Sequence, residues 1–198
     1  MPNQSLSKGT IKTNDLGVVS YKKVGGITAS QINQEVSGIY GIFNGGDAAQ
    51  PFDASLGATN GVKFYRLKYN TTIPENNKTY RVSGLLAVPN IDSSNKLPML
   101  SWQHGTILFP EDAPSRLVKN DDFQESATFK RSALGPPRSA ETLFNAARMA
   151  GNGYILAAAD YIGNGISGNA PQAYGVKEAT QQTTFDMITA SKAVLGEL

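Results

Sequence analysis

The chain has 198 residues, of which 40% are hydrophobic and 17% charged, a composition typical of a folded domain with a sizeable core. The net charge of +2 and the scattered lysines and arginines argue against nucleic-acid binding. The chain has no cysteine, which excludes thiol chemistry, and its single histidine excludes a histidine-rich metal site. We therefore expect no metal, no cofactor and no nucleic-acid partner. We also expect no signal peptide at the amino terminus and no transmembrane segment.

The first 60 residues are predicted to form an amino-terminal arm with one short helix. Residues 1–27 are polar and rich in glycine and lysine, so we expect a loosely held segment there. The stretch Thr28-Ala-Ser-Gln31 has the pattern of a capping box and should begin the helix. Ile32 and Val36 follow at helical spacing and should face the core.

Residues 61–71 and 79–88 are two runs rich in aromatic and β-branched residues, as in strands. A turn-forming segment that begins at Pro74 separates them. We predict that the two runs pair as an antiparallel hairpin.

Strands and helices are expected to alternate from residue 97 onward. Leu97–Gln103 and Tyr154–Ala159 are short apolar runs typical of parallel strands buried on both faces. A helix capped by Ser139 should join them, and a last helix should run over Gln181–Leu195 with Phe185 on its apolar face. This order predicts an α/β fold with a mostly parallel sheet, a leading antiparallel hairpin and helices on both faces.

The strand over 97–103 ends in His104-Gly105-Thr106, a turn that fits acyl-transfer chemistry. Glycine lets the backbone turn sharply and lets a ligand come close. Backbone N–H groups held at a strand end stabilise the oxyanion of a tetrahedral intermediate. Gly105 and Thr106 are therefore candidate oxyanion donors, and His104 should order the turn beside the substrate. A plain strand-to-loop turn is the alternative, because His-Gly is a short signal.

The strand over 154–159 ends in Asp160-Tyr-Ile-Gly163-Asn-Gly165-Ile-Ser167-Gly168. An aspartate at a strand end accepts hydrogen bonds from the turn that follows it, and the glycines allow a tight loop. Asp160, Gly163 and Gly165 are therefore predicted to shape the wall of the site. The glycine spacing also matches a nucleotide-binding pattern, a weaker alternative because Pro171 precedes any helix.

A catalytic triad made within this chain is disfavoured. It would combine His104, Asp160 and Ser167, so the residues would follow the chain order His–Asp–Ser. In serine hydrolases built on an α/β sheet the chain order is Ser–Asp–His. Ser167 also lacks the strand–elbow–helix setting that exposes a nucleophilic serine. No Gly-x-Ser-x-Gly occurs anywhere in the sequence.

Several stretches, in this order and spacing, resemble the α/β-hydrolase superfamily, and more narrowly its secreted lipase/esterase-type serine hydrolases. The main stretches are Phe64–Thr71, Val82–Pro89, Leu100–Thr106 and Ala158–Gly165. The resemblance covers about residues 60–198. It implies that Tyr161 lines the substrate pocket and that the nucleophile, acid and base lie beyond Leu198.

From this resemblance we expect residues 61–198 to be the leading part of a serine carboxylic-ester hydrolase, truncated before its nucleophile. Its substrate would be an ester or lipid-like small molecule, and its location extracellular or periplasmic. The chain alone should be inactive, and its partner should be the remaining carboxyl-terminal half. Strand 97–103 would then be an unpaired edge. The alternative is a non-catalytic α/β module that binds an acyl ligand or a partner chain.

Overall fold

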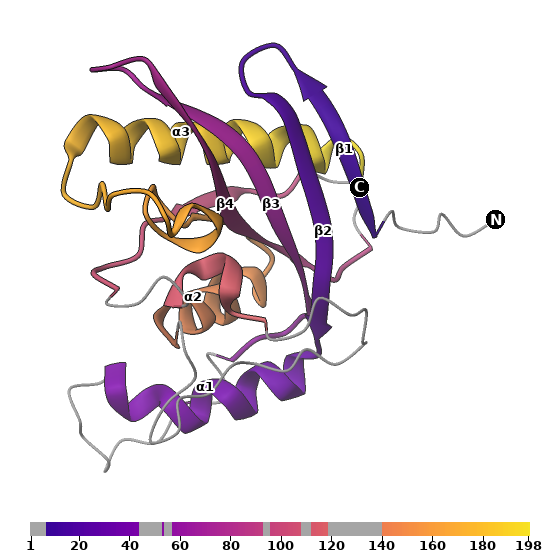
Figure 1. Ribbon diagram of the computed structural model, residues 1–198. Coiled ribbons are helices and arrows are strands. Elements are labelled where there is room, and N and C mark those ends of the chain that lie inside the picture. The colour runs from indigo at the N-terminus through magenta and orange to yellow at the C-terminus, as the bar shows by residue number, and fades with distance from the viewer. Residues whose placement is uncertain (1–6, 44–52, 54–56, 93–95, 108–111, 119–139) are drawn as a thin grey trace.

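The computed structural model describes residues 7–43, 53, 57–92, 96–107, 112–118 and 140–198. In these residues six strands form one sheet in the order β1-β2-β3-β4-β6-β5 (Figure 1). The strands are β1 (Lys8–Thr13), β2 (Gly17–Ile27), β3 (Val62–Ile73), β4 (Lys78–Pro89), β5 (Met99–Trp102) and β6 (Ile155–Ala159). The helices are α1 (Ala29–Phe43), α2 (Ala140–Ala150) and α3 (Lys177–Leu195), with short 3-10 turns η3 (Pro114–Arg116) and η4 (Gly165–Ser167).

The α/β class is confirmed, but the expectation of a mostly parallel sheet is wrong. β5 and β6 pair in parallel, as the strand–helix–strand order predicted. The other neighbouring strands of the described sheet pair antiparallel, including β4 with β6. The predicted hairpin is confirmed, because β3 and β4 pair without a break from Val62↔Pro89 to Ile73↔Lys78.

Two of the four antiparallel pairings of the described sheet involve the amino-terminal segment, where the prediction of a loose arm is wrong. Residues 8–27 form β1 and β2, and β2 pairs with β3. Val19 and Tyr21 of β2 are buried, whereas Ser20 and Lys22, which alternate with them, are only partly buried. This alternation is the signature of a strand with one covered face, but the lysines and glycines of the segment obscured it. The expected domain boundary at residue 60 stays a prediction.

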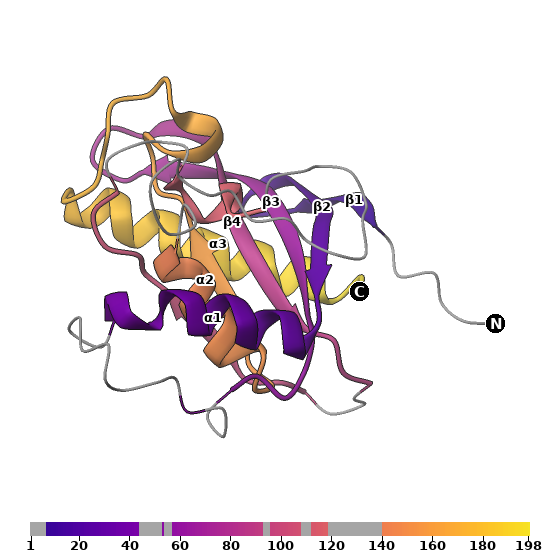
Figure 2. The same cartoon turned by 90° about the horizontal axis from the view of Figure 1, so that it is seen from below.

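Helices cover both faces of the sheet, as predicted (Figures 1 and 2). α1 and α2 pack on one face in a cluster that includes Ile32, Val36 and Leu143. α3 packs on the other face, where Met187 and Ala190 join a second cluster. The capping box is confirmed: Gln31 N–H donates to Thr28 Oγ1 at 3.3 Å and Thr28 N–H to Gln31 Oε1 at 3.0 Å.

Three finer predictions about α2 and α3 are wrong or lie outside the described part. α3 begins at Lys177, one turn before the predicted start, and Phe185 is 62% exposed instead of facing the core. The buried positions of α3 include Thr183, Met187 and Ala190, a line of mixed polarity that apolar spacing alone does not reveal. Ser139, the predicted cap of α2, lies outside the described residues.

β5 lies at the edge of the described sheet. It was predicted to be buried on both faces, yet Leu100 is 36% exposed and Met99 and Trp102 are partly exposed. A strand paired on one side only has one open backbone edge and less cover for its side chains. β6, between β4 and β5, is fully buried as predicted.

Candidate functional site

The two predicted loops lie together because the strands that carry them are parallel neighbours. Trp102 of β5 pairs with Ala158 of β6, so both strands end at the same edge of the sheet. The turn His104–Thr106 leaves β5 there, and the loop Asp160–Ser167 leaves β6 beside it. Loops at the carboxyl ends of parallel strands are the usual place for ligand sites in α/β sheets.

His104 is buried at this junction. Its ring lies against the ring of Tyr161, with 4.3 Å between the centroids. Its Nδ1 lies 2.8 Å from the carbonyl oxygen of Gly105. A carbonyl oxygen accepts only, so Nδ1 carries the proton of this bond. The Nε2 atom is buried and has no partner among the described residues.

The backbone N–H groups of the turn differ in what they contact. The Gly105 N–H donates to Oε2 of Glu141 at 3.3 Å. Glu141 stands in the first turn of α2, where a negative charge is favoured by the helix dipole. Thr106 is exposed, and its N–H has no hydrogen-bond partner among the described residues. The Gly105 N–H thus holds a carboxylate oxygen, and the Thr106 N–H has no partner among the described residues.

Tyr161 has an unusual backbone and is deeply buried. Its φ is 63°, in the left-handed region that is rare for a bulky side chain. The ring lies between those of His104 and Tyr174, with 6.1 Å to the Tyr174 centroid. Burial, followed by the proximity of Tyr174 and Glu141, raises its pKa to about 12. Tyr161 thus stays neutral at physiological pH and links the β5 turn to the β6 loop.

The carboxylate of Asp160 accepts hydrogen bonds from η3 and β4, and not, as the sequence predicted, from the turn that follows it. It is fully buried, and both carboxylate oxygens accept hydrogen bonds. Oδ1 accepts the Ser115 N–H at 2.8 Å and Oδ2 accepts the Ser83 hydroxyl at 2.5 Å. Ser83 Oγ in turn accepts the Ile166 N–H at 3.1 Å. This network ties β4, η3 and η4 to the end of β6, so Asp160 holds the loop in place.

The glycines of the loop are required by its geometry. Gly163 has φ of +91° and Gly165 has φ of +56°, conformations that favour glycine. A Cβ on Gly165 would lie 2.0 Å from Asp160 Oδ2 and 2.4 Å from Ser83 Oγ. A Cβ on Gly163 would lie 2.6 Å from Cα of Gln172. A residue with a side chain is therefore disfavoured at both positions, because its Cβ would clash and because its backbone rarely adopts these φ values.

Ser167 is used inside the loop, which agrees with the argument against an internal triad. It is buried, its Oγ accepts the Gly163 N–H at 3.1 Å, and its hydroxyl donates to the Asn164 carbonyl at 2.8 Å. The nucleotide-binding alternative also loses support, because the glycines lead into the 3-10 turn η4 and the next α-helix begins only at Lys177. A phosphate-binding glycine loop opens directly onto a helix.

Sequence reasoning missed three members of this site. Glu141, Ser83 and Ser115 come from three different elements, and only the folded chain brings them to the β6 loop and the β5 turn. A glutamate in the first turn of a helix was the one available signal for Glu141. The described residues contain no group of three histidine or acidic side chains placed to hold a metal ion. None of their helices is long and apolar enough to cross a membrane.

The fold resembles several solved hydrolase structures. A Legionella pneumophila protein with a provisional assignment as a hydrolase superposes with a TM-score of 0.62 at 21% identity, over 89% of this chain and 38% of that chain. A single-residue variant of the rice cell wall degrading esterase LipA from Xanthomonas oryzae gives a TM-score of 0.60 at 19% identity, over 91% and 38%. Its ligand-bound form gives 0.56 at 19% identity, over 89% and 37%.

This chain has a hydrolase-like fold. It spans less than two fifths of the length of those structures, 38% in the first two. No model of a protein family matches the sequence, and no characterised protein sequence does. At this level of identity the likeness concerns the fold, and the chemistry of the site rests on its own geometry.

Proposed function

We propose that this chain is the leading portion of a serine carboxylic-ester hydrolase and that it contributes the oxyanion hole. The observation that carries the proposal is the turn after β5. There the Gly105 N–H already holds a carboxylate oxygen of Glu141, and the neighbouring Thr106 N–H is open. Two adjacent N–H groups fixed at a strand end are the donors that a tetrahedral oxyanion needs.

In this proposal Thr106 is the principal donor. An oxyanion at Gly105 would have to displace the Glu141 carboxylate, and two negative charges at that distance repel each other. Thr106 has no such competitor among the described residues. His104 and Tyr161, whose rings are in contact, would form the inner wall of the substrate pocket, and the Asp160 network would hold the β6 loop beside it.

The nucleophile is proposed to come from polypeptide outside these 198 residues. Ser167 is committed to its own loop, and β5 offers an open edge with a partly exposed Leu100 on it. A strand that pairs with this edge would cover β5 and could carry a nucleophilic serine to the same end of the sheet. The partner is thus the remaining half of the hydrolase, and its substrate an ester or lipid-like molecule. We place the protein outside the cytoplasm, which cell fractionation would test.

The first test is the coding sequence after codon 198. A Gly-x-Ser-x-Gly within the next few tens of codons supports the proposal, and a stop codon there favours the non-catalytic module. The second test uses a fluorophosphonate probe, which reacts with activated serines. The 198-residue chain alone should not be labelled, whereas the chain together with the downstream polypeptide should be. Labelling of Ser167 in the chain alone would contradict the proposal.

The role of Thr106 is tested in the active, completed protein with p-nitrophenyl esters. Thr106→Pro removes the backbone N–H, and kcat should fall about 10²–10³-fold, as for other oxyanion donors. Thr106→Ala is the matched control, since it changes the side chain and keeps the N–H. If the two variants lose activity equally, the backbone N–H is not the donor.

A further inference from the structure

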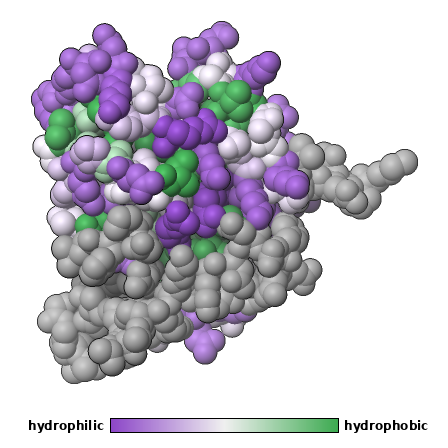
Figure 3. Space-filling model, viewed as in Figure 1, coloured by the Kyte–Doolittle hydropathy of each residue, from purple (hydrophilic) through white to green (hydrophobic). Residues whose placement is uncertain are grey.

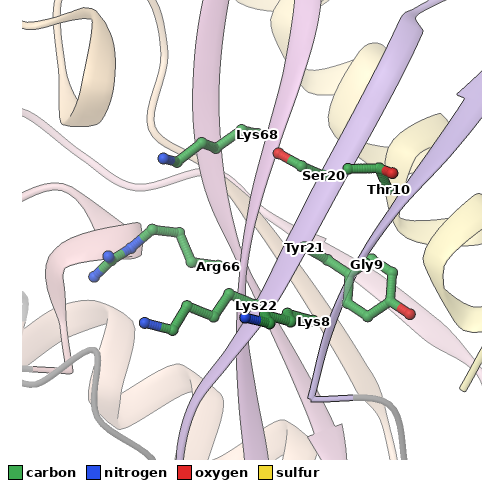
Figure 4. Close-up of a pocket in the computed structure, with 8 residues that line it drawn as sticks. All are labelled: Lys8, Gly9, Thr10, Ser20, Tyr21, Lys22, Arg66 and Lys68. Atoms are coloured by element: carbon green, nitrogen blue, oxygen red, sulfur yellow. The ribbon is translucent and has the colours of Figure 1, made fainter.

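A group of basic side chains lies on the β1–β2–β3 part of the sheet, far along the chain from the β5 turn. We call it the cationic strip, and it consists of Lys8, Lys22, Arg66 and Lys68 with the hydroxyls of Thr10 and Ser20. Lys8 pairs with Lys22 across β1 and β2, and Lys22 pairs with Arg66 across β2 and β3. Figure 4 shows that Lys22, Arg66 and Lys68 extend to the same side of the sheet.

The strip lies on the sheet face that carries α1 and α2, beyond the part that these helices cover. Phe64 belongs to the core under the helices, and Arg66 and Lys68 continue the same face of β3 away from it. The residues of the strip line a hollow of about 470 Å³. Figure 3, drawn from the same side as Figure 1, shows a band of hydrophilic residues down the middle of this face.

The arrangement places like charges opposite one another on neighbouring strands. Like charges directly opposite each other on neighbouring strands destabilise a sheet, and the strip places cations opposite one another twice in one row. None of the described residues that line the hollow is acidic. The whole chain has 18 basic and 16 acidic side chains, so the clustering does not follow from a general excess of positive charge.

Hydrogen bonds orient two arginine side chains, Arg66 of the strip and Arg81 beside it. Nε of Arg66 donates to the Ser115 carbonyl at 2.9 Å, which fixes this side chain across β3. Arg81 of β4 reaches over to β2, where it donates to the Val18 carbonyl and, at 3.3 Å, to the Ser20 hydroxyl. The bonds of Arg81 orient its guanidinium group without neutralising its charge, so Arg81 adds to the positive field over Ser20.

We propose that the cationic strip is a binding site for a small phosphorylated ligand with two or more phosphate charges. Lysine ammonium groups and arginine are the usual partners of phosphate oxygens, and hydroxyls add neutral donors. Lys8, Lys22 and Arg66 are spread over three strands spaced about 4.8 Å apart, a reach that favours a ligand with more than one phosphate. A hollow of this size is typical of small-molecule sites. The site is independent of the hydrolase proposal.

The test is a titration of the 198-residue chain with inorganic pyrophosphate, followed by calorimetry and by backbone amide NMR shifts. We expect saturable binding with shifts at Thr10, Ser20 and Lys22, and weaker binding of orthophosphate. Lys22→Gln should lower the pyrophosphate affinity about fivefold or more, which is the order of effect of one unit charge near a surface. Lys192→Gln, on α3 at the opposite face, is the matched control and should leave the affinity unchanged. Without ligand, Lys22→Gln should raise Tm, because it removes the repulsion in the row.

Three results would overturn the inference. Equal affinities for pyrophosphate, orthophosphate and sulfate would indicate simple charge screening instead of a site. An unchanged affinity in Lys22→Gln would place any binding elsewhere. Binding to vesicles that contain phosphatidylglycerol, with no binding of pyrophosphate, would identify the strip as a surface for anionic membranes.

Discussion

Replacement of Gly165 by alanine should be among the most damaging small changes in this protein. The new Cβ would stand 2.0 Å from Asp160 Oδ2 and 2.4 Å from Ser83 Oγ, closer than any real contact allows. The carboxylate and hydroxyl are both fully buried, so they have no solvent into which to withdraw. The variant therefore has to break the hydrogen bond between them or shift η4 away from β4.

The expected loss of unfolding free energy in Gly165→Ala is the sum of two contributions. An alanine at φ of +56° is strained by about 1–2 kcal/mol relative to glycine. Loss of a buried hydrogen bond to a charged group costs about 1.5–3 kcal/mol. The sum, about 2.5–5 kcal/mol, is a large part of the stability of a typical domain. For a chain of this size Tm falls by about 2–4 °C for each kcal/mol.

Urea unfolding followed by circular dichroism measures the change in free energy. Gly153→Ala is the matched control, because Gly153 also has positive φ, +93°, but nothing lies within 4 Å of a Cβ built there. It should show the backbone strain alone, about 1–2 kcal/mol. Equal destabilisation in the two variants would refute the argument that the Ser83–Asp160 contact leaves no room at Gly165.

Three further predictions concern other parts of the molecule. Because its pKa is raised to about 12, Tyr161 should ionise late in an absorbance titration at 295 nm; the phase near pH 12 should disappear in Tyr161→Phe, and the stability that the neutral side chain contributes should be lost as pH rises from about 10 to 12. Burial raises the pKa of Asp186 above 3.8, so the folded state holds this proton to higher pH than the unfolded chain, and the wild type should lose stability relative to Asp186→Asn as pH rises through that window; a difference that is constant with pH would argue against this. Phe185→Ala should change the free energy of unfolding by less than about 0.5 kcal/mol, whereas Met187→Ala should lower it by about 2–5 kcal/mol, and the reverse order in urea unfolding would show that α3 faces the other way.

Local signals in the sequence predicted several elements well. The capping box at Thr28, the β3–β4 hairpin and the parallel pair β5–β6 each depend on neighbouring residues or on a short apolar run with its connection. The glycines and the aspartate after β6 were also predicted as a structural loop. A turn residue or a cap has most of its partners within a few positions, so its pattern survives in the sequence.

Other features depended on which segments meet. The composition of segment 8–27 indicates a polar arm. In the fold, β2 pairs with β3, and the alternation of buried and partly buried side chains along β2 is that of a strand with one covered face. Phe185 is predicted to be a core residue from its apolar side chain, but α3 packs on the sheet with Met187 buried and Phe185 exposed. In both cases the composition of a segment is ambiguous, and the neighbour it packs against decides which face is buried.

The sequence by itself determined the α/β class, the β3–β4 hairpin and the capping box that begins α1. Each of these depends on residue types and spacings within one short stretch. The tertiary structure alone decided that Glu141 holds the Gly105 N–H, that Ser83 and Ser115 satisfy Asp160, and that four basic residues gather on β1–β3. These partners are up to 77 residues apart in the chain. Hydrogen bonds and charge pairs depend on distances of a few ångströms, and strand order and helix docking set those distances.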